Sequence, residues 1–216
     1  MMKLYCFGES GNCYKAALTL ELSGLPWQAV PMDFFGGEAR SDTFKRDINP
    51  MGEAPVLIDT DTDYRLTQSG AIQDYITALT GKLTGETPEA RREVLRWTLW
   101  DNHKLSSQAG MLRFLMNFLP EEKRPQEVIA FTKGRLAATY TVLNDHLTGR
   151  DWIATDTLTT ADISCAGYLY YPEPFGFERT AFPAIDAWLT RLSDTPGWKH
   201  PYDLLPAPTV GKDNRS

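Results

Sequence analysis

Short apolar runs alternate with helically spaced apolar residues in the N-terminal part of the chain. Strands are predicted from the runs at residues 3–7, 27–30, 55–59 and 64–66. Apolar residues spaced three or four positions apart predict helices over residues 12–23, 42–48 and 69–80. A polar Asp/Thr turn between the last two strands is typical of a hairpin. The predicted order up to Gly81 is therefore β-α-β-α-β-β-α.

The predicted helix ends carry recognisable start and stop residues. Gly24 and Gly81 follow the first and third helices, and Asp42 is expected to cap the second. Asn49-Pro50 ends that second helix, because a residue before proline avoids the helical conformation.

After a connector at residues 82–88 the strand signals stop and long helical patterns begin. Prolines near the first turn mark two long helices over residues 88–118 and 125–147, and shorter helices are expected over 160–168 and 183–193. We therefore predict a first domain at residues 1–81, an all-helical domain at 88–200 and a tail at 201–216. The polar, Pro/Gly-bearing segment from Ala207 onward is expected to be frayed.

Composition narrows the class of protein. The chain has 216 residues, 42% of them hydrophobic and 23% charged, with a net charge of −6, which is typical of a globular protein of one or two domains. Nucleic-acid binders usually carry a basic excess, so that class is not expected. No window approaches the roughly 20 apolar residues of a membrane helix. The N-terminal residues reach Gly8 before a signal-peptide core forms, so export is not expected either.

The cysteines and histidines argue against a metal site. Cys6, Cys13 and Cys165 form an odd set without paired spacing, and the three histidines are scattered. A disulfide framework or zinc site is therefore not expected, and a reducing cytoplasm fits this cysteine usage best.

A Gly-containing junction at residues 8–13 is the first candidate for chemistry. It joins a predicted strand to a predicted helix, where unpaired N–H groups and the helix dipole favour negative charge. Ser10 and Cys13 are spaced as in a C-x-x-C redox motif, but the nucleophilic position holds a hydroxyl. No histidine lies nearby in sequence to act as a base, so we expect Ser10 to donate a hydrogen bond to the thiolate of a ligand. The structural alternative is a simple N-cap.

The energetics of such a role are reasonable. Lowering a thiol pKa from about 8.5 to about 6.5 requires roughly 2.7 kcal/mol of preferential thiolate stabilisation. A hydrogen bond to a charged group contributes about 1.5–3 kcal/mol, and a helix N-terminus about 0.3–1 kcal/mol more. One hydroxyl at a helix start can therefore supply most of the shift.

Two further junctions favour a peptide ligand. Pro55 stands at the start of a predicted strand, and a cis Ala54–Pro55 bond would turn the N–H and C=O of Ala54 outward to pair with a ligand as an added strand would. Gln68 and Ser69 open the third helix, whose free amides suit a carboxylate. A rigid turn and an ordinary cap are the alternatives, and only the co-occurrence of the three junctions favours binding.

Residues 158–163 have the pattern of a capping box. Thr159 is placed as the cap, Asp162 as its reciprocal partner, and Leu158 and Ile163 as a hydrophobic staple. We expect Asp162 to orient a buried helix, so that its loss damages folding more than binding. The aromatic side chains of the second domain are expected to be mostly core, with a few lining an apolar pocket that faces Ser10.

These segments together resemble the cytosolic glutathione transferases, from Lys3 to about Trp198. Residues 10–15 are similar to the serine-type activation loop of bacterial members, residues 49–57 to the cis-proline segment, and Gln68-Ser69 to the pair that binds the γ-glutamyl carboxylate. Residues 159–162 and 182–189 resemble the folding motif and final core helix of the family's second domain. The resemblance implies a thioredoxin-like N-terminal domain followed by an all-helical C-terminal domain that contributes the electrophile pocket.

The resemblance also implies a function and a set of site residues. It implies a cytoplasmic, homodimeric glutathione S-transferase of the detoxifying kind, which activates the thiol of glutathione for attack on a small apolar electrophile, without a metal. Ser10 would be the catalytic residue. The glutathione-binding set implied is Ser10, Asn12, Glu53, Ala54, Pro55, Gln68 and Ser69. The family more often has Val or Ile where this chain has Ala54, but a contact through the backbone should survive that change.

Several alternatives stay open at this point. Tyr5, Asn12 and Cys13 are the other candidates for thiol activation, and Arg40 and Lys45 are among those for the glycyl carboxylate. A glutathione-dependent isomerase or dehalogenase would use the same activated thiolate. A non-catalytic binding module would keep the fold only, and a thiol-disulfide oxidoreductase would have to rely on Cys13.

Overall fold

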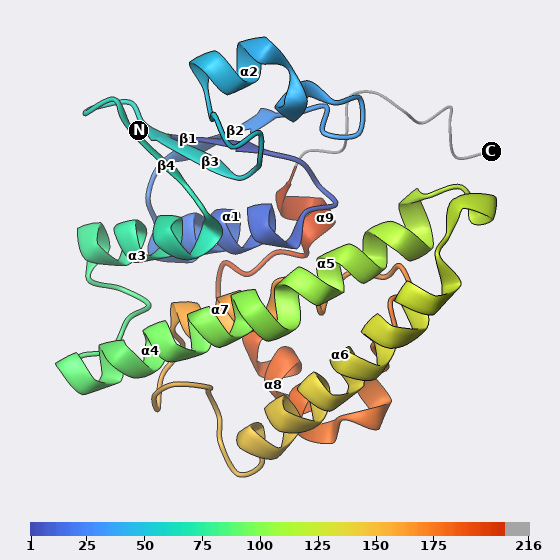
Figure 1. Cartoon of the computed structure of the whole chain (residues 1–216). Coiled ribbons are helices and arrows are strands. Elements are labelled where there is room, and N and C mark those ends of the chain that lie inside the picture. Colours follow the sequence, from blue (N-terminus) through green and yellow to red (C-terminus); the bar gives the residue numbers. More distant parts are fainter. Residues whose placement is uncertain (206–216) are drawn as a thin grey trace. The chain divides into compact units, whose positions relative to one another are not determined.

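The computed structural model describes residues 1–205, which divide into two compact units. Met1–Gly81 and the chain from Gly197 form the first unit, and Lys82–Pro196 form the second (Figure 1). The fraying expected from Ala207 onward lies outside the described residues. Within the segment predicted to be a tail, Pro201–Leu204 form a short helix, α9.

The first unit is built on a four-stranded sheet with the order β2-β1-β3-β4. Strand β2 runs parallel to β1, whereas β3 is antiparallel to both of its neighbours. The strands are β1 (Met2–Cys6), β2 (Trp27–Pro31), β3 (Val56–Asp59) and β4 (Tyr64–Thr67). The helices of Met1–Gly81 are α1 (Gly11–Ser23), α2 (Asp42–Asp47) and α3 (Ser69–Thr80), with a 3-10 turn at Glu38–Arg40. This order confirms the prediction up to Gly81.

Both faces of the sheet are covered. Helices α1 and α3 lie side by side on one face, and α2 lies on the other (Figure 1). Leu4 and Leu57 are partners across β1 and β3, and both are buried. Under α2 a separate apolar cluster forms around Met32, Phe44 and Val56. The alternation of strand side chains between the two faces explains these two cores.

The cap of α2 corrects one prediction. The Ser41 Oγ accepts a hydrogen bond from the Phe44 N–H at 3.1 Å, so Ser41 is the N-cap and Asp42 is the first helical residue. Serine and aspartate both cap helices well, so adjacent residues of these types cannot be told apart by residue type alone. The C-terminal glycines were predicted correctly, because Gly24 and Gly81 both adopt the left-handed conformation.

The second unit is helical. The helices of Lys82–Pro196 are α4 (Pro88–Trp100), α5 (Ser107–Arg113), α6 (Gln126–Leu147), α7 (Thr160–Ala166) and α8 (Pro183–Ser193). 3-10 turns occur at Glu121–Lys123 and Arg179–Ala181. The helix predicted over 160–168 ends at Ala166 instead. None of the helices in the described part of the chain is long and apolar enough to cross a membrane.

The helix predicted over residues 88–118 is continuous but not uniform. Two π-helical segments, Asp101–Ser106 and Phe114–Phe118, flank α5. The buried Asp101 carboxylate accepts hydrogen bonds from the Ser106 hydroxyl at 2.6 Å and from the Ser164 hydroxyl of α7 at 2.7 Å. A π-turn changes the spacing by about one residue, which apolar periodicity alone does not reveal.

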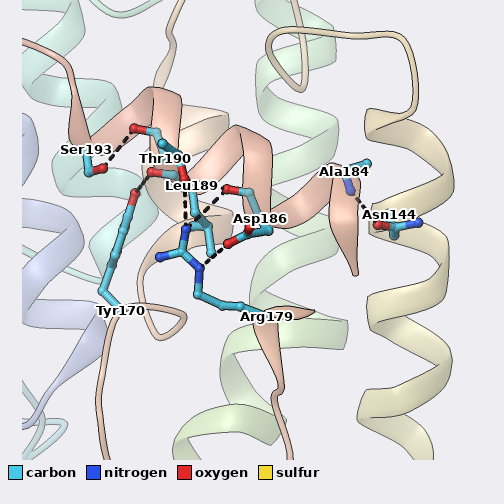
Figure 2. A network of polar contacts seen from close by, with 8 residues as sticks. All are labelled: Asn144, Tyr170, Arg179, Ala184, Asp186, Leu189, Thr190 and Ser193. Atoms are coloured by element: carbon cyan, nitrogen blue, oxygen red, sulfur yellow. Dashed lines mark hydrogen bonds and ion pairs between the residues drawn. The ribbon is translucent and has the colours of Figure 1, made fainter. Parts of the chain in front are cut away.

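Polar contacts attach α8 within this unit (Figure 2). The helix receives no side-chain cap from Phe182, and the Asn144 Oδ1 of α6 accepts a hydrogen bond from the Ala184 N–H instead, at 3.0 Å. The Arg179 Nε lies 2.6 Å from the Asp186 carboxylate, and the figure shows this guanidinium folded against α8. Contacts between segments distant in sequence therefore fix the position of α8.

The predicted capping box is present at α7. The Asp162 Oδ2 accepts the Thr159 N–H at 2.9 Å, and its Oδ1 accepts the Ile153 N–H and the Trp188 indole N–H at 2.9 and 3.0 Å. Burial raises the pKa of Asp162 to about 6, against the opposing effect of these hydrogen bonds. One carboxylate thus connects α7, α8 and the loop before them.

Candidate functional site

Three chain segments reach the same edge of the sheet. Tyr5 pairs with Val56 across β1 and β3, and Val56 pairs with Thr67 across β3 and β4. Because these strands are antiparallel, β1 ends, β3 begins and β4 ends at one edge. The segments that emerge there contain Ser10, Ala54 and Ser69, so the three predicted junctions come together.

Ser10 is the N-cap of α1. It is 6% exposed, and its backbone is extended, with φ −92° and ψ 111°. Its Oγ accepts a hydrogen bond from the Cys13 N–H at 3.2 Å, and its own N–H donates to the Phe7 carbonyl at 3.3 Å. The cap uses an acceptor lone pair, so the hydroxyl proton can still be donated. The structural alternative considered for Ser10 is therefore present, and it is compatible with a chemical role.

Cys13 lies behind Ser10 and is fully buried. Burial raises the pKa of its thiol to about 11, and hydrogen bonding with Ser10 offsets only part of this effect. Burial also raises the pKa of Cys6. Both thiols are therefore held neutral near pH 7, where they are poor nucleophiles.

The two remaining candidates for thiol activation differ in position. The Tyr5 ring packs edge-on against Phe44, with centroids 6.3 Å apart, in the cluster under α2. Asn12 is half-buried in the first turn of α1, and its Oδ1 accepts a hydrogen bond from the Ser69 hydroxyl at 3.5 Å. Asn12 thus connects the starts of α1 and α3, whereas Tyr5 takes part in packing.

The loop before β3 is held by Asn49, which the sequence indicated only as the end of the second helix. Asn49 is 1% exposed, its Nδ2 donates to the Glu53 carbonyl at 2.9 Å, and its Oδ1 accepts the Met51 N–H at 3.0 Å. Gly52 has a φ of +67°, and a Cβ there would lie 3.0 Å from the Ala39 carbonyl oxygen. An asparagine that bonds the backbone two residues on is a recognisable turn signal, which could have identified Asn49.

The Ala54–Pro55 bond is cis, as expected. Ala54 is half-buried and Pro55 is buried. Glu53 is exposed beside them, and its Oε2 accepts a hydrogen bond from the Gln68 Nε2 at 3.0 Å. The residue before Ala54 and the residue before Ser69 are therefore in direct contact.

Ser69 does not cap α3. Gln68 occupies the cap position, with a φ of +68° and no side-chain capping bond, and Ser69 is the first helical residue. The Ser69 hydroxyl donates to Asn12 instead, and the side chain is 5% exposed. The capping explanation for Ser69 is wrong, because its hydroxyl points to the start of α1 rather than to the amides of its own helix.

The helix N-termini at this edge favour anionic groups. The N-termini of α1 and α3, each longer than three turns, are linked there through the Ser69–Asn12 bond, and helix N-termini stabilise thiolates, carboxylates and phosphates. Lys45 of α2 passes close to this edge, since its Cε would lie 3.2 Å from a Cβ on Gly52. Arg40 lies near Gly37 in the loop before α2. Glu53 supplies a carboxylate that suits an ammonium group.

No group of three or more His, Cys, Asp or Glu side chains suited to a metal ion occurs within residues 1–205. The expectation that the enzyme needs no metal stays a prediction.

The fold and this edge define a class of protein. Its members join a thioredoxin-like unit, with a serine in place of the attacking cysteine, to an all-helical unit in one chain. Comparison with known protein families gives a match to each of the two parts of the chain. Residues 1–78 match the model described as the N-terminal domain of glutathione S-transferase, and residues 105–196 match the C-terminal domain model. The chain belongs to the glutathione S-transferase family.

Relatives extend over nearly the full chain. Glutathione S-transferase GstB of Escherichia coli (strain K12) is 30% identical over 199 residues, covering 91% of this chain and 95% of the relative. Glutathione S-transferase GST-4.5 of Xanthomonas campestris pv. campestris is 32% identical over 196 residues, covering 88% and 92%. A crystal structure of a possible glutathione S-transferase from Rhodopseudomonas palustris has a TM-score of 0.85 and 31% identity, covering 99% and 94%. The predicted fold class and the prediction of a glutathione transferase are confirmed.

Proposed function

We propose that Ser10 stabilises the thiolate of bound glutathione, which then attacks a small apolar electrophile. The supporting observation is the position of the Ser10 hydroxyl at the start of α1, on the sheet edge shared with Ala54 and Ser69. The thiol proton leaves to solvent, the sulfur forms a bond to the electrophilic carbon, and in a substitution the leaving group departs as an anion.

Ser10 is preferred over the other candidates on physical grounds. A thiol with a pKa of about 11, as at Cys13, is not ionised near neutral pH and is not exposed to a ligand. Tyr5 is engaged in packing against Phe44. Asn12 already accepts the Ser69 hydrogen bond, and a neutral amide is a weaker choice than a hydroxyl at a cap.

The other predicted residues fit parts of the tripeptide. The cysteinyl backbone is proposed to pair with Ala54 beside Pro55. The γ-glutamyl carboxylate is proposed to bind the first amides of α3 and the Ser69 hydroxyl, which would turn from the Asn12 Oδ1 to the ligand. Gln68 and Asn12 stand beside it. Glu53 is proposed to face the γ-glutamyl ammonium group. Lys45 passes close to this edge and Arg40 lies in the loop before α2, and we propose the glycyl carboxylate for these two cations.

Substitution of Ser10 by Ala tests the assignment. We expect turnover to fall by about tenfold or more, because a hydrogen bond to a charged group contributes about 1.5–3 kcal/mol, while glutathione binding stays within a few-fold. Thr87→Ala is the matched control, since the Thr87 hydroxyl caps α4 by accepting the Ala90 N–H at the same 3.2 Å. Equal turnover in Ser10→Ala and wild type would reject the serine assignment.

Product analysis then separates the reaction types. Conjugation consumes glutathione and releases the leaving group, whereas isomerisation returns glutathione unchanged. Dehalogenation releases halide, and the fate of glutathione depends on the second step. We propose conjugation, so glutathione loss and product formation should be equal in amount.

The cellular setting and assembly are also proposed. Cys6, Cys13 and Cys165 are buried thiols outside any disulfide, which fits a reducing compartment such as the cytoplasm, where such enzymes detoxify electrophiles. Leu95 and Leu99 stand one turn apart on α4 with 56% and 60% of their surface exposed, and Phe131 on α6 is 65% exposed. Exposed apolar groups of this size favour an interface, and we propose a homodimer.

A further inference from the structure

Residues 197–205 return to the N-terminal unit, although more than a hundred residues separate them from Gly81. We refer to residues 197–205 as the C-terminal strap. Pro201 and Leu205 of the strap are buried, and its helix α9 contacts α1. The strap therefore packs against α1, the helix that Ser10 caps.

The first attachment lies one turn from Ser10. Tyr14 is fully buried, and its backbone N–H donates to the Ser10 carbonyl at 2.9 Å. Its side-chain hydroxyl donates to the carbonyl of Lys199 in the strap, also at 2.9 Å. One residue thus joins the turn that presents Ser10 to a segment from the other end of the sequence.

The second attachment lies near the end of the same helix. The Lys199 Nζ pairs with the Glu21 Oε1 at 2.6 Å, and the other oxygen of Glu21 accepts the Trp27 indole N–H at 3.0 Å. The hydrogen bond from Lys199 lowers the pKa of Glu21. Lys199 therefore contacts α1 at two levels, through its carbonyl near the first turn and through its side chain near the last.

We propose that the strap positions Ser10 for thiol activation, with Tyr14 as the positioning residue, an inference that rests on the function proposed for Ser10. Backbone hydrogen bonds join each turn of α1 to the next, so a contact that holds its first turns also holds its N-cap. Hydrogen bonds weaken steeply with poor distance and angle, and small displacements at a reacting group have large effects on rate. Tyr14 makes its contact from the turn next to Ser10, which gives it the larger effect.

Two variants separate the attachments. Tyr14→Phe removes the hydroxyl that donates to the strap and keeps the ring. Lys199→Met removes the ion pair with Glu21 but keeps the carbonyl that Tyr14 uses. Tyr75→Phe is the matched control, because the Tyr75 hydroxyl donates to Asp59 at 2.8 Å, and Asp59 pairs with Met2 at the opposite edge of the same sheet.

The readout is the pH dependence of kcat/KM with glutathione and chlorodinitrobenzene, together with the thiolate absorbance of bound glutathione. For Tyr14→Phe we expect the acidic limb to move upward by about half a pH unit, which lowers the thiolate fraction below the midpoint about threefold. Lys199→Met should move it upward by less, and Tyr75→Phe should leave it in place. A loss of stability alone would not move this profile.

The outcomes are distinct. An unmoved profile in folded Tyr14→Phe, with an upward shift in Ser10→Ala, overturns the positioning role and leaves the proposed function intact. An equal shift in Tyr14→Phe and Tyr75→Phe also overturns it, because the effect would not be specific to the strap. If Tyr14→Phe fails to fold, Lys199→Met decides whether the strap positions Ser10, because an unmoved profile in that variant overturns the proposal. An unmoved profile in Ser10→Ala rejects the proposed function itself.

Discussion

Ser10, Ser41 and Ser69 all stand at helix N-termini, yet their hydroxyls make different contacts. Ser10 and Ser41 accept hydrogen bonds from amides of the helices that they cap. Ser69 stands one position later and donates to Asn12 on another helix. The hydrogen bond that a serine hydroxyl makes therefore depends on its position in the first turn of the helix. A hydroxyl at the sheet edge can bind a ligand even where the residue type suggests only a helix cap.

Glu53 gives a prediction at this scale. Its carboxylate is exposed beside Ala54 and already accepts from Gln68, so Glu53→Gln should keep a polar contact while losing the charge that faces the γ-glutamyl ammonium. We expect the KM for glutathione to rise by up to about fivefold, as an exposed ion pair contributes about 0.2–1 kcal/mol, with kcat nearly constant. Titration calorimetry of glutathione checks this, and an unchanged affinity would exclude the contact.

The sequence predicted which junctions come together better than it predicted the contacts among their residues. Ser10, Ala54 and Ser69 could be selected because each stands at a junction between predicted elements. The role of Asn49 in holding the loop was not predicted, because its bonds to Met51 and Glu53 depend on how the loop folds. The Gln68–Glu53 and Ser69–Asn12 contacts join residues far apart in sequence, which a single sequence does not reveal.

Helices and strands were predicted most accurately where glycine or proline marks their ends. Helices α3 and α8 have the predicted bounds because Gly81 and Pro183 stop and start them. The π-turns beside α5 were not predicted, because the buried Asp101 that bonds Ser106 and Ser164 acts through tertiary contacts. Local patterns therefore define an element, and packing decides its detailed geometry.

Asp162 allows a test of α7 through pH. Its folded pKa of about 6 lies above the unfolded value of about 3.9, so between these values the folded state holds the extra proton. The stability contributed by this group therefore decreases as pH rises through that window. Asp162→Asn lacks this titration, so the free energy of unfolding of wild type minus that of the variant should decrease between pH 4 and pH 7.

Denaturant unfolding at several pH values measures this difference. A difference that stays constant or increases with pH would contradict the raised pKa. At one pH, the unfolding measurement is paired with a glutathione-binding measurement on the folded variant. If the capping box is structural, Asp162→Asn should lose stability while its glutathione binding remains close to that of wild type.

The two compact units do not correspond to two consecutive parts of the sequence. The N-terminal unit includes residues from both ends of the described chain, because Lys199 binds Tyr14 and Glu21. A sequence reading places a boundary where composition changes, as it does after Gly81. It does not show a later segment that returns to an earlier helix, because that return depends on a few long-range contacts.

Assembly gives a prediction for the whole molecule. If exposed Leu99 on α4 lies in a two-fold interface, Leu99→Glu would place a charge in an apolar contact and two like charges near each other. We expect the variant to be monomeric in light scattering at concentrations where the wild type is dimeric, with its circular dichroism unchanged. A dimer of unchanged affinity would exclude Leu99 from the interface.

Thiol activation by Ser10 is tested most directly by an ultraviolet difference titration of bound glutathione against pH, in wild type and in Ser10→Ala. We predict a thiolate signal in wild type with a midpoint about one to two units below the free-thiol value of about 8.5, and a higher midpoint in the variant. Bound glutathione that ionises near 8.5 in wild type, or at the same lowered pH in both proteins, would contradict the role assigned to Ser10.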